Sequence, residues 1–284
     1  MKLLRVGERG SERPAVLGAD GTARDLSGIA GDFGPPFFAS GGLARVAELV
    51  RDGAHNRLPA VAGRIGAPIA RPGKIVCIGL NYSDHAAETG QAPPDRPVVF
   101  MKDPSTMVGP HDDVLIPRGS VKADWEVELG VVIGATARYL DSPAAALRTV
   151  AGYAISNDVS ERAFQLELSP QWDLGKSCET FNPLGPWLVT ADEVPDPQEL
   201  GLRLTVNGRP RQDGSTAAMI FGVGYLIWYL SQYMVLEPGD LVNTGTPAGV
   251  ALGLPDHPYL RDGDRVDLEI DGLGQAGQRF VAAP

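Results

Sequence analysis

The sequence predicts a β-rich fold of the mixed α/β class, in which a small N-terminal α/β domain precedes a larger β-roll or sandwich domain. Many short runs of strand-forming residues follow one another, and turns rich in Gly, Pro and Asp separate them. Stretches with helical spacing are few, which argues against the alternating strands and helices of a doubly wound parallel sheet. With 284 residues, the chain is long enough for one large domain or two unequal ones.

The small domain is expected over residues 1–70. Its first segments, Leu3–Val6 and Pro14–Leu17, predict a short hairpin, and Leu43–Val50 has the spacing of an amphipathic helix. The stretch Gly63–Pro72 is interrupted by Gly and Pro and predicts a linker. The larger domain then covers residues 71–284.

In the larger domain, strands are predicted at regular intervals and helices at three places. The predicted strands are Ile75–Gly79, Val98–Met101, Val114–Ile116, Val127–Ile133, Gly152–Ser156, Trp187–Thr190, Leu202–Val206, Leu241–Thr244 and Val266–Ile270. One helix opens at Ser142-Pro143 and runs toward Val150, and a second is capped by Ser160 and runs toward Leu168. The third lies in the uncharged segment Ala217–Leu236.

The segment Ala217–Leu236 is long enough to span a bilayer, so a transmembrane helix has to be distinguished from a buried helix here. Ser231, Gln232 and three tyrosines interrupt it, and its flanks carry no excess of positive charge. These features favour a buried core helix or a helix–strand pair. The N-terminus lacks the continuous apolar stretch of a signal peptide, so a cytoplasmic protein without a membrane partner is expected.

Composition excludes several functional classes. Asp and Glu number 35 against 25 Lys and Arg, a net charge of −10 that leaves no basic face for nucleic acid. Cys77 and Cys178 cannot form a disulfide framework or a thiolate zinc site; packing is the expected role, and a catalytic role stays open. The GxGxxG string at Gly272–Gly277 is followed by too few residues for a dinucleotide-binding unit and is interpreted as a turn.

An acidic cluster is the most informative part of the sequence. Glu126 and Glu128 are two residues apart on a predicted strand, so their side chains point to the same side. Two adjacent negative charges before the apolar run Leu129–Ile133 are costly unless a cation lies between them. The pair is interpreted either as a solvated face at a sheet edge or as oxygen ligands of a hard divalent cation.

A third carboxylate and a lysine extend this hypothesis. Asp158 ends a predicted strand just before a helix, where it is either part of a turn or cap or a further ligand. Three oxygen donors without Cys or a spaced His pair suit Mg²⁺ or Mn²⁺. Lys176 would offset part of the negative charge or hold a substrate oxygen; alternatively, it is an exposed surface lysine.

His85 has a carboxylate one helical turn away. The i,i+3 spacing places Glu88 beside it on one helix face, where the pair could act as a general base toward water. A plain surface pair is the alternative. The loop-like segment 89–97 that follows suits a mobile lid.

Together these segments resemble the fumarylacetoacetate hydrolase family. The resemblance covers about the last three-quarters of the chain, with the motifs in the expected order. The matching motifs are GLNYSDHAAE (79–88), FMKDPST (100–106), DWEVELGVVIG (124–134), ISNDVSERAFQ (155–165), GKSCETFNPLGPW (175–187) and TGTPAGV (244–250). The resemblance implies a β-rich roll, a homodimer and a small-molecule keto-acid substrate.

Carried over residue by residue, the resemblance implies three groups of site residues. The ligands of Mg²⁺ or Mn²⁺ would be Glu126, Glu128 and Asp158. The catalytic residues would be His85 and Glu88, as a water-activating pair, and Lys176, as a holder of the substrate or its oxyanion. The substrate contacts would be Arg162, Gln165 and Thr246.

Within the family, the motif PRGSVKADWEVELG resembles that of the branch that hydrolyses 2,4-diketo-3-deoxy sugar acids such as the rhamnonate and fuconate derivatives. Water activated by His85 and Glu88 would attack C4 of the metal-chelated diketo acid, and C3–C4 cleavage would give pyruvate and a short carboxylic acid. The alternatives are an oxaloacetate-type decarboxylase, a 2-keto-4-pentenoate-type hydratase and a non-enzymatic binding protein.

Overall fold

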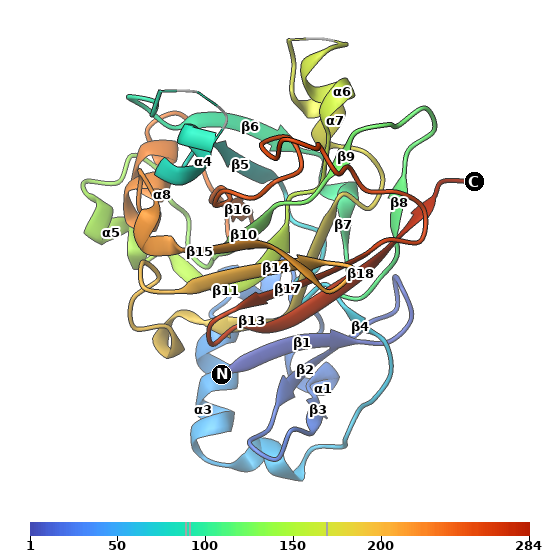
Figure 1. The fold of residues 1–284 in the computed structure, drawn as a ribbon. Coiled ribbons are helices and arrows are strands. Elements are labelled where there is room, and N and C mark those ends of the chain that lie inside the picture. The colour runs from blue at the N-terminus through green and yellow to red at the C-terminus, as the bar shows by residue number, and fades with distance from the viewer. Residues whose placement is uncertain (89, 91, 169) are drawn as a thin grey trace.

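The computed structural model describes residues 1–88, 90, 92–168 and 170–284. It shows mixed α/β structure dominated by strands, which confirms the predicted fold class. The N-terminal strands and helices lie together at one end of the molecule, below the larger part (Figure 1). The predicted boundary between residues 70 and 71 stays a prediction.

The largest sheet has the strand order β3-β2-β1-β13-β11-β10-β16-β5-β6, with β4 paired to β1 and β7 paired to β13. The N-terminal strands join it because β1 pairs with β13, with Lys2 opposite Val189. The bounds are β1 Lys2–Val6, β2 Arg13–Leu17, β3 Ala23–Asp25, β4 Ile65–Gly66, β5 Ile75–Gly79, β6 Val98–Lys102, β7 Met107–Val108, β10 Val127–Ile133, β11 Val150–Asn157, β13 Asn182–Thr190 and β16 Leu241–Asn243.

The predicted linker Gly63–Pro72 is not irregular throughout. Ile65 and Gly66 form β4 and pair antiparallel with Val6 and Arg5 of β1. A two-residue strand among glycines and prolines leaves no alternating pattern to detect, so the sequence prediction was wrong at this point.

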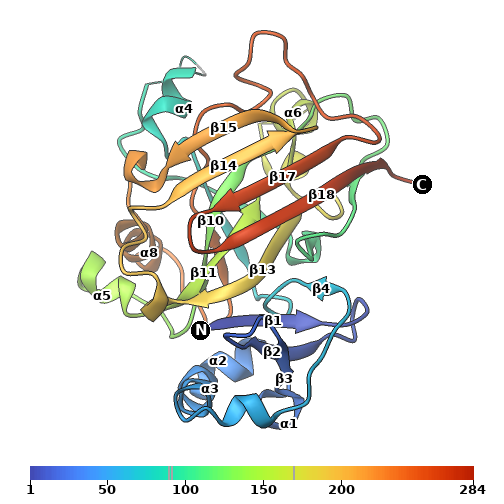
Figure 2. The ribbon, with the colours of Figure 1, turned by 60° about the horizontal axis from the view of Figure 1, so that its bottom comes forward.

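A second sheet, with the order β15-β14-β17-β18-β8, packs over β10, β11 and β13 (Figure 2). Its strands are β8 Val114–Ile116, β14 Gly201–Val206, β15 Arg209–Ser215, β17 Arg265–Ile270 and β18 Gly274–Ala282. The turn predicted at Gly272–Gly277 ends at Leu273, because Gly274 already pairs with Ile270 as the first residue of β18. Strand β15 was not predicted, because its sequence RPRQDGS contains no β-branched or aromatic residue.

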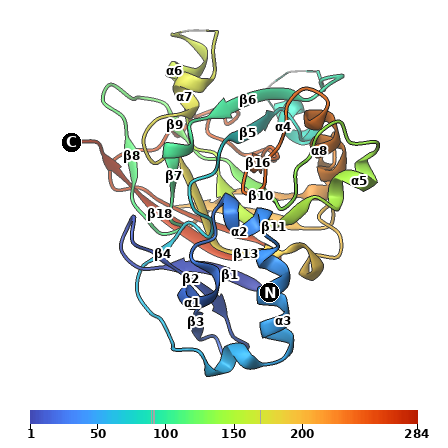
Figure 3. The ribbon, with the colours of Figure 1, turned by 180° about the vertical axis from the view of Figure 1, so that it is seen from behind.

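The helices are short and lie around the sheets (Figure 3). Their bounds are α1 Ser27–Ala30, α2 Pro35–Ala39, α3 Gly42–Arg51, α4 Ser83–Glu88, α5 Pro143–Leu147, α6 Arg162–Leu166, α7 Asp173–Lys176 and α8 Val223–Ser231. Four 3₁₀ turns, counted over the described residues, are η1 Ala54–Arg57, η2 Pro104–Thr106, η3 Ala191–Glu193 and η4 Thr216–Ala218.

Two helix predictions can be compared in detail. Ser142 caps α5 as predicted, its hydroxyl accepting from the N–H of Ala145 at 3.2 Å. The cap of α6 is Glu161 and not Ser160, because Ser160 belongs to the small strand β12 (Ser160–Glu161), which pairs with β9 (Ala123–Asp124). The Glu161 carboxylate accepts from the N–H of Ala163 at 3.0 Å.

The apolar segment Ala217–Leu236 contains α8, a helix of nine residues that packs against α5. The prediction of a buried helix is confirmed, since Leu226, Ile227 and Leu230 are buried in the main core. Within the described parts of the chain, no helix is long and apolar enough to cross a membrane.

Candidate active site

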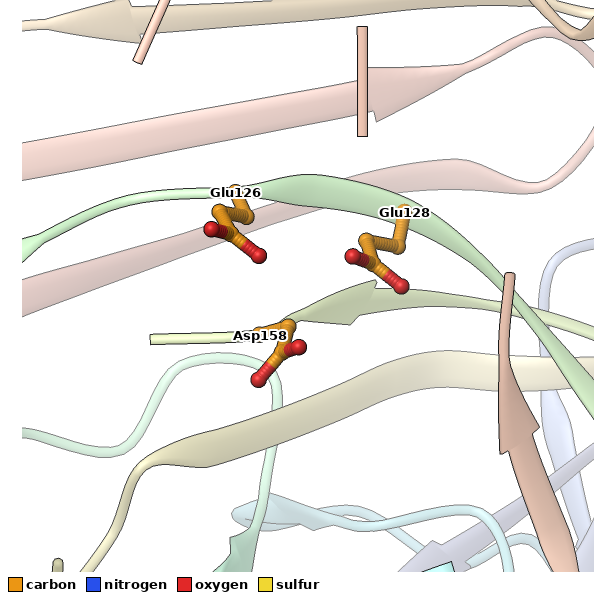
Figure 4. Close-up of side chains that lie close together, drawn as sticks. All are labelled: Glu126, Glu128 and Asp158. Carbon is orange, nitrogen blue, oxygen red and sulfur yellow. The ribbon is translucent and has the colours of Figure 1, made fainter. Parts of the chain in front are cut away.

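Three carboxylates meet where β10 begins and β11 ends (Figure 4). The strands are antiparallel with Val127 opposite Asn157, so Glu126 and Asp158 are next to each other just beyond the paired residues. The N–H of Asp158 donates to the carbonyl of Glu126 at 3.0 Å. One carboxylate oxygen from each of Glu126, Glu128 and Asp158 lies within 4.8 Å of the others. The structure therefore brings the three predicted ligands together.

These carboxylates are buried, which rules out the alternative of a solvated face at a sheet edge. Strand β10 lies between β11 and β16, and each of its residues is buried. Burial, together with the neighbouring charges of Asp158 and Glu126, raises the pKa of Glu128 well above its ordinary value. Its carboxylate accepts from the N–H of Gly245 at 2.9 Å. A cation bound beside Glu128 would therefore stabilise its ionised form strongly.

Two lysines hold Asp158 from opposite sides. Lys176 Nζ lies 2.9 Å from Oδ2 and Lys102 Nζ lies 2.6 Å from Oδ1. Lys176 also reaches Glu126 Oε2 at 2.8 Å, and its side chain is 2% exposed, so the alternative of a surface lysine is wrong. Burial opposes its charge, but Asp158 and Glu126 raise its pKa, and the side chain stays an ammonium.

Lys176 reaches the cluster because α7 packs closely on α6. A Cβ on Gly175 would lie 2.4 Å from the backbone nitrogen of Gln165 and 2.5 Å from the carbonyl oxygen of Glu161. Only glycine allows this approach, so Gly175 places its neighbour Lys176 beside Glu126.

Lys102 was missed by the sequence analysis, although it lies in the quoted motif FMKDPST. Its ammonium also donates to the carbonyl of Val159 at 2.9 Å, and its side chain is fully buried. A single lysine at the end of a strand has no pattern that separates it from a surface residue. Its role depends on a partner 56 positions away in the chain.

We expect Lys102→Met to lower the free energy of unfolding by about 3–5 kcal/mol, because it leaves one oxygen of a buried aspartate without its cation. Urea denaturation monitored by circular dichroism measures the change. The control is Lys122→Met, which removes a partly exposed ion pair with Glu167 and should cost at most about 1 kcal/mol. Equal losses in the two variants would contradict this account of Lys102.

Arg162 connects the cluster to a fourth buried carboxylate. Its guanidinium lies 2.7 Å from Glu126 Oε1 and 2.8 Å from Asp124 Oδ2. It also donates to the side-chain oxygen of Gln165 at 3.0 Å. Burial raises the pKa of Glu126, but the charges of Lys176 and Arg162 outweigh it and lower the pKa to about 2. Asp124, which sequence reasoning missed, therefore balances the charge of the predicted substrate contact.

His85 and Glu88 form the predicted pair on α4. His85 Nδ1 lies 3.5 Å from Glu88 Oε2, and His85 is buried. His85 lines the same pocket as Glu126 and Glu128, which places the imidazole near the carboxylates. Of the segment expected to form a lid, Thr89 and Gln91 lie outside the described residues.

A pocket with a volume of about 60 Å³ joins these groups. The predicted residues among its lining are His85, Glu126, Glu128, Arg162, Gln165, Lys176 and Thr246. The remaining predicted residues contact residues of the lining. Glu88 contacts His85, and Asp158 contacts Lys176. Phe100 and Trp172 form part of an apolar wall that the sequence analysis did not identify. Their rings meet edge to face, with the ring centroids 5.4 Å apart.

Residues 74–281 match the family model described as fumarylacetoacetate (FAA) hydrolase C-terminal. The chain belongs to the fumarylacetoacetate hydrolase family. A protein of Burkholderia multivorans that carries only a general hydrolase name is 54% identical over 284 residues, covering 100% of both chains.

Two solved structures that share the fold are similar to this chain over its whole length. Fumarylacetoacetate hydrolase from Exiguobacterium antarcticum is 36% identical, with a TM-score of 0.84 and complete coverage of both chains. Maleylpyruvate hydrolase from Sphingobium sp. SYK-6, solved with manganese(II) and pyruvate, is 28% identical with a TM-score of 0.81, also over 100% of both chains.

The donor set fits a hard divalent cation. Three carboxylates offer oxygens within 4.8 Å of one another, and Mg²⁺ and Mn²⁺ prefer such ligands. Among the described residues, no other group of three or more His, Cys, Asp or Glu side chains gathers in this way. Glu126, Glu128 and Asp158 are thus the residues that could hold an ion.

Proposed function

We propose that this chain is a divalent-metal-dependent hydrolase that cleaves the C3–C4 bond of a 2,4-diketo acid. The products are pyruvate and a short carboxylic acid. The observation that carries the proposal is the placement of a buried carboxylate triad and the His85–Glu88 pair around one pocket. Family membership and the pyruvate bound to the maleylpyruvate hydrolase are consistent with it.

The charges of the site support a bound divalent cation. The buried carboxylates of Asp124, Glu126 and Asp158 are paired with Lys102, Lys176 and Arg162, whereas the buried carboxylate of Glu128 is in no such pair. Ionised Glu128 would therefore give this cluster an excess negative charge, which a divalent cation offsets in a site where unbalanced charge is expensive.

When bound, Mg²⁺ or Mn²⁺ supplies a Lewis acid for the oxygens of a 2-keto acid. Glu88 orients the His85 ring through Nδ1, which leaves Nε2 to take a proton from water. The resulting hydroxide adds to C4, and the C3–C4 bond breaks with its electron pair on C3 of the pyruvate part. The proton held by His85 is then returned to C3, which gives pyruvate and the carboxylic acid. Lys176 and Arg162 keep their positive charges close to the new negative charge.

Gln165 and Thr246 are proposed as substrate contacts. Both line the pocket, and Thr246 is held in place because its hydroxyl donates to the carbonyl of Val127 at 2.9 Å and accepts from Gln212 at 2.8 Å. We further propose that the protein is a cytoplasmic homodimer. Within the family, we propose the branch acting on 2,4-diketo-3-deoxy-rhamnonate or fuconate, on the basis of the motif PRGSVKADWEVELG.

The test is pyruvate release from 2,4-dioxopentanoate, a simple acylpyruvate, and from oxaloacetate. We expect turnover of the diketo acid with Mn²⁺ or Mg²⁺, its loss after EDTA treatment and its return when metal is added back. The activity on oxaloacetate should be at least about tenfold lower, because decarboxylation makes no use of the His85–Glu88 pair. Faster turnover of oxaloacetate would favour a decarboxylase and overturn the proposal.

A further inference from the structure

The carboxylate of Glu88 is held by the segment Gly249–Gly253, which begins with the last two residues of the motif TGTPAGV (244–250). The N–H of Gly249 lies 3.0 Å from Oε1 and 3.1 Å from Oε2 of Glu88, so it donates to both oxygens. This segment is 161 residues away from Glu88 in the sequence. The same carboxylate faces His85 through Oε2.

Gly253 contributes by having no side chain. A Cβ at this position would lie 2.3 Å from Cδ, 2.4 Å from Oε2 and 2.5 Å from Cγ of Glu88. Each of its three nearest neighbours is thus an atom of the Glu88 side chain. The φ angle of Gly253 is not in the left-handed region, so an alanine fits its backbone, and its closest conflict is with the side chain of Glu88.

The segment itself is fixed by buried hydrogen bonds. The carbonyl of Gly249 accepts from the indole N–H of Trp125 at 3.1 Å. The N–H groups of Ala251 and Leu252 donate to the Asp124 carboxylate at 2.7 and 3.0 Å. Asp124 in turn binds Arg162 at 2.8 Å. The support for Glu88 is therefore tied to the same carboxylate that positions the arginine of the pocket.

We propose that Gly249 and Gly253 are positioning residues for the His85–Glu88 pair: Gly249 through its N–H and Gly253 through the space that it leaves. This inference rests on the proposed role of the pair in activating water. Since Gly249 has a φ of +106° and its Cβ would lie 1.9 Å from the Arg211 carbonyl oxygen, its replacement disturbs the fold. Gly253 is the position that can be tested cleanly.

The experiment is the replacement Gly253→Ala, alone and combined with Glu88→Ala. We expect Gly253→Ala to lower kcat for the diketo acid by about 100-fold, because general-base catalysis contributes about 10²–10⁴ in rate. KM should change less than twofold, and Mn²⁺ binding measured by calorimetry should stay at the wild-type affinity. The matched control is Gly28→Ala, where a Cβ meets no atom within 4 Å and the backbone is unstrained; its kcat should equal that of the wild type.

The double variant separates a positioning role from general damage. The Glu88→Ala background lacks the three atoms that lie nearest to the new Cβ, so Gly253→Ala should change kcat less than twofold there. Equal fold-losses in both backgrounds, or wild-type kcat for Gly253→Ala alone, would overturn the proposal.

The same cycle measured by urea unfolding does not depend on the reaction. Gly253→Ala should lower the unfolding midpoint of the wild type and leave that of Glu88→Ala unchanged. If the wild type turns over no diketo acid, the proposed function fails, while this result still decides whether Gly253 makes room for Glu88. Identical midpoint shifts in both backgrounds would overturn the placement.

Discussion

Replacing Glu128 with glutamine is expected to abolish turnover and to weaken Mn²⁺ binding by at least about 100-fold, since even residues that only orient metal ligands contribute 10–100-fold. Glu128 differs from the other two carboxylates of the triad. Glu126 and Asp158 each contact lysine or arginine, whereas the Glu128 carboxylate accepts from the N–H of Gly245. The metal ion is thus the partner that this carboxylate needs most.

The same replacement should make the metal-free protein more stable. Burial raises the pKa of folded Glu128 well above 4.5, its ordinary value, so ionising it is costlier in the folded state. Metal-free wild type therefore loses stability as pH rises from 4.5 through the raised folded pKa, and Glu128→Gln should not show this loss.

Urea unfolding between pH 4.5 and 8, with EDTA, together with calorimetric titration of Mn²⁺, provides the measurement. The control is Glu269→Gln, which removes an exposed carboxylate on β17. It should change neither the pH dependence of stability nor the affinity for Mn²⁺. Unchanged Mn²⁺ affinity in Glu128→Gln, or a variant less stable than the wild type without metal at pH 8, would contradict this account of Glu128.

Glu88→Gln should lower kcat by about 10²–10⁴-fold and leave Mn²⁺ binding unchanged, because it removes the negative charge that faces the His85 ring when this ring takes a proton from water, while the triad stays intact. His85→Ala should give a loss of the same size, and combining the two should add little, since the residues act as one unit. Steady-state kinetics and calorimetry measure the two quantities separately.

Asp84→Asn is the matched control for Glu88→Gln. It removes a carboxylate from the exposed side of the same helix and keeps an oxygen that can accept from the N–H of His85, now at 2.8 Å. Its kcat should stay within twofold of the wild type. If Asp84→Asn and Glu88→Gln reduced kcat equally, the net charge of α4 would matter and not the pairing of His85 with Glu88.

The sequence alone predicts the strand-rich class and most of the larger strands, because runs such as Val127–Ile133 are long, apolar and rich in β-branched residues. It also predicts that Glu126 and Glu128 share a side, since side-chain direction alternates along a strand. Strand β15 was missed because polar residues on a partly exposed strand leave no pattern.

The buried partners of the site could not be predicted in the same way. Lys102 and Asp124 have their roles only through Asp158 and Arg162, which lie 56 and 38 positions away in the chain. Gly253 differs from other glycines only in what its absent side chain would meet. Such roles depend on packing between distant segments, which local residue preference does not encode.

The most direct test of the central claim is a crystal structure of the protein soaked in Mn²⁺, with anomalous scattering used to locate the ion. A single strong peak per chain, within bonding distance of carboxylate oxygens from Glu126, Glu128 and Asp158, is the predicted result. No peak among these oxygens, or a peak bound by other side chains, would contradict the metal site and the hydrolase mechanism that depends on it.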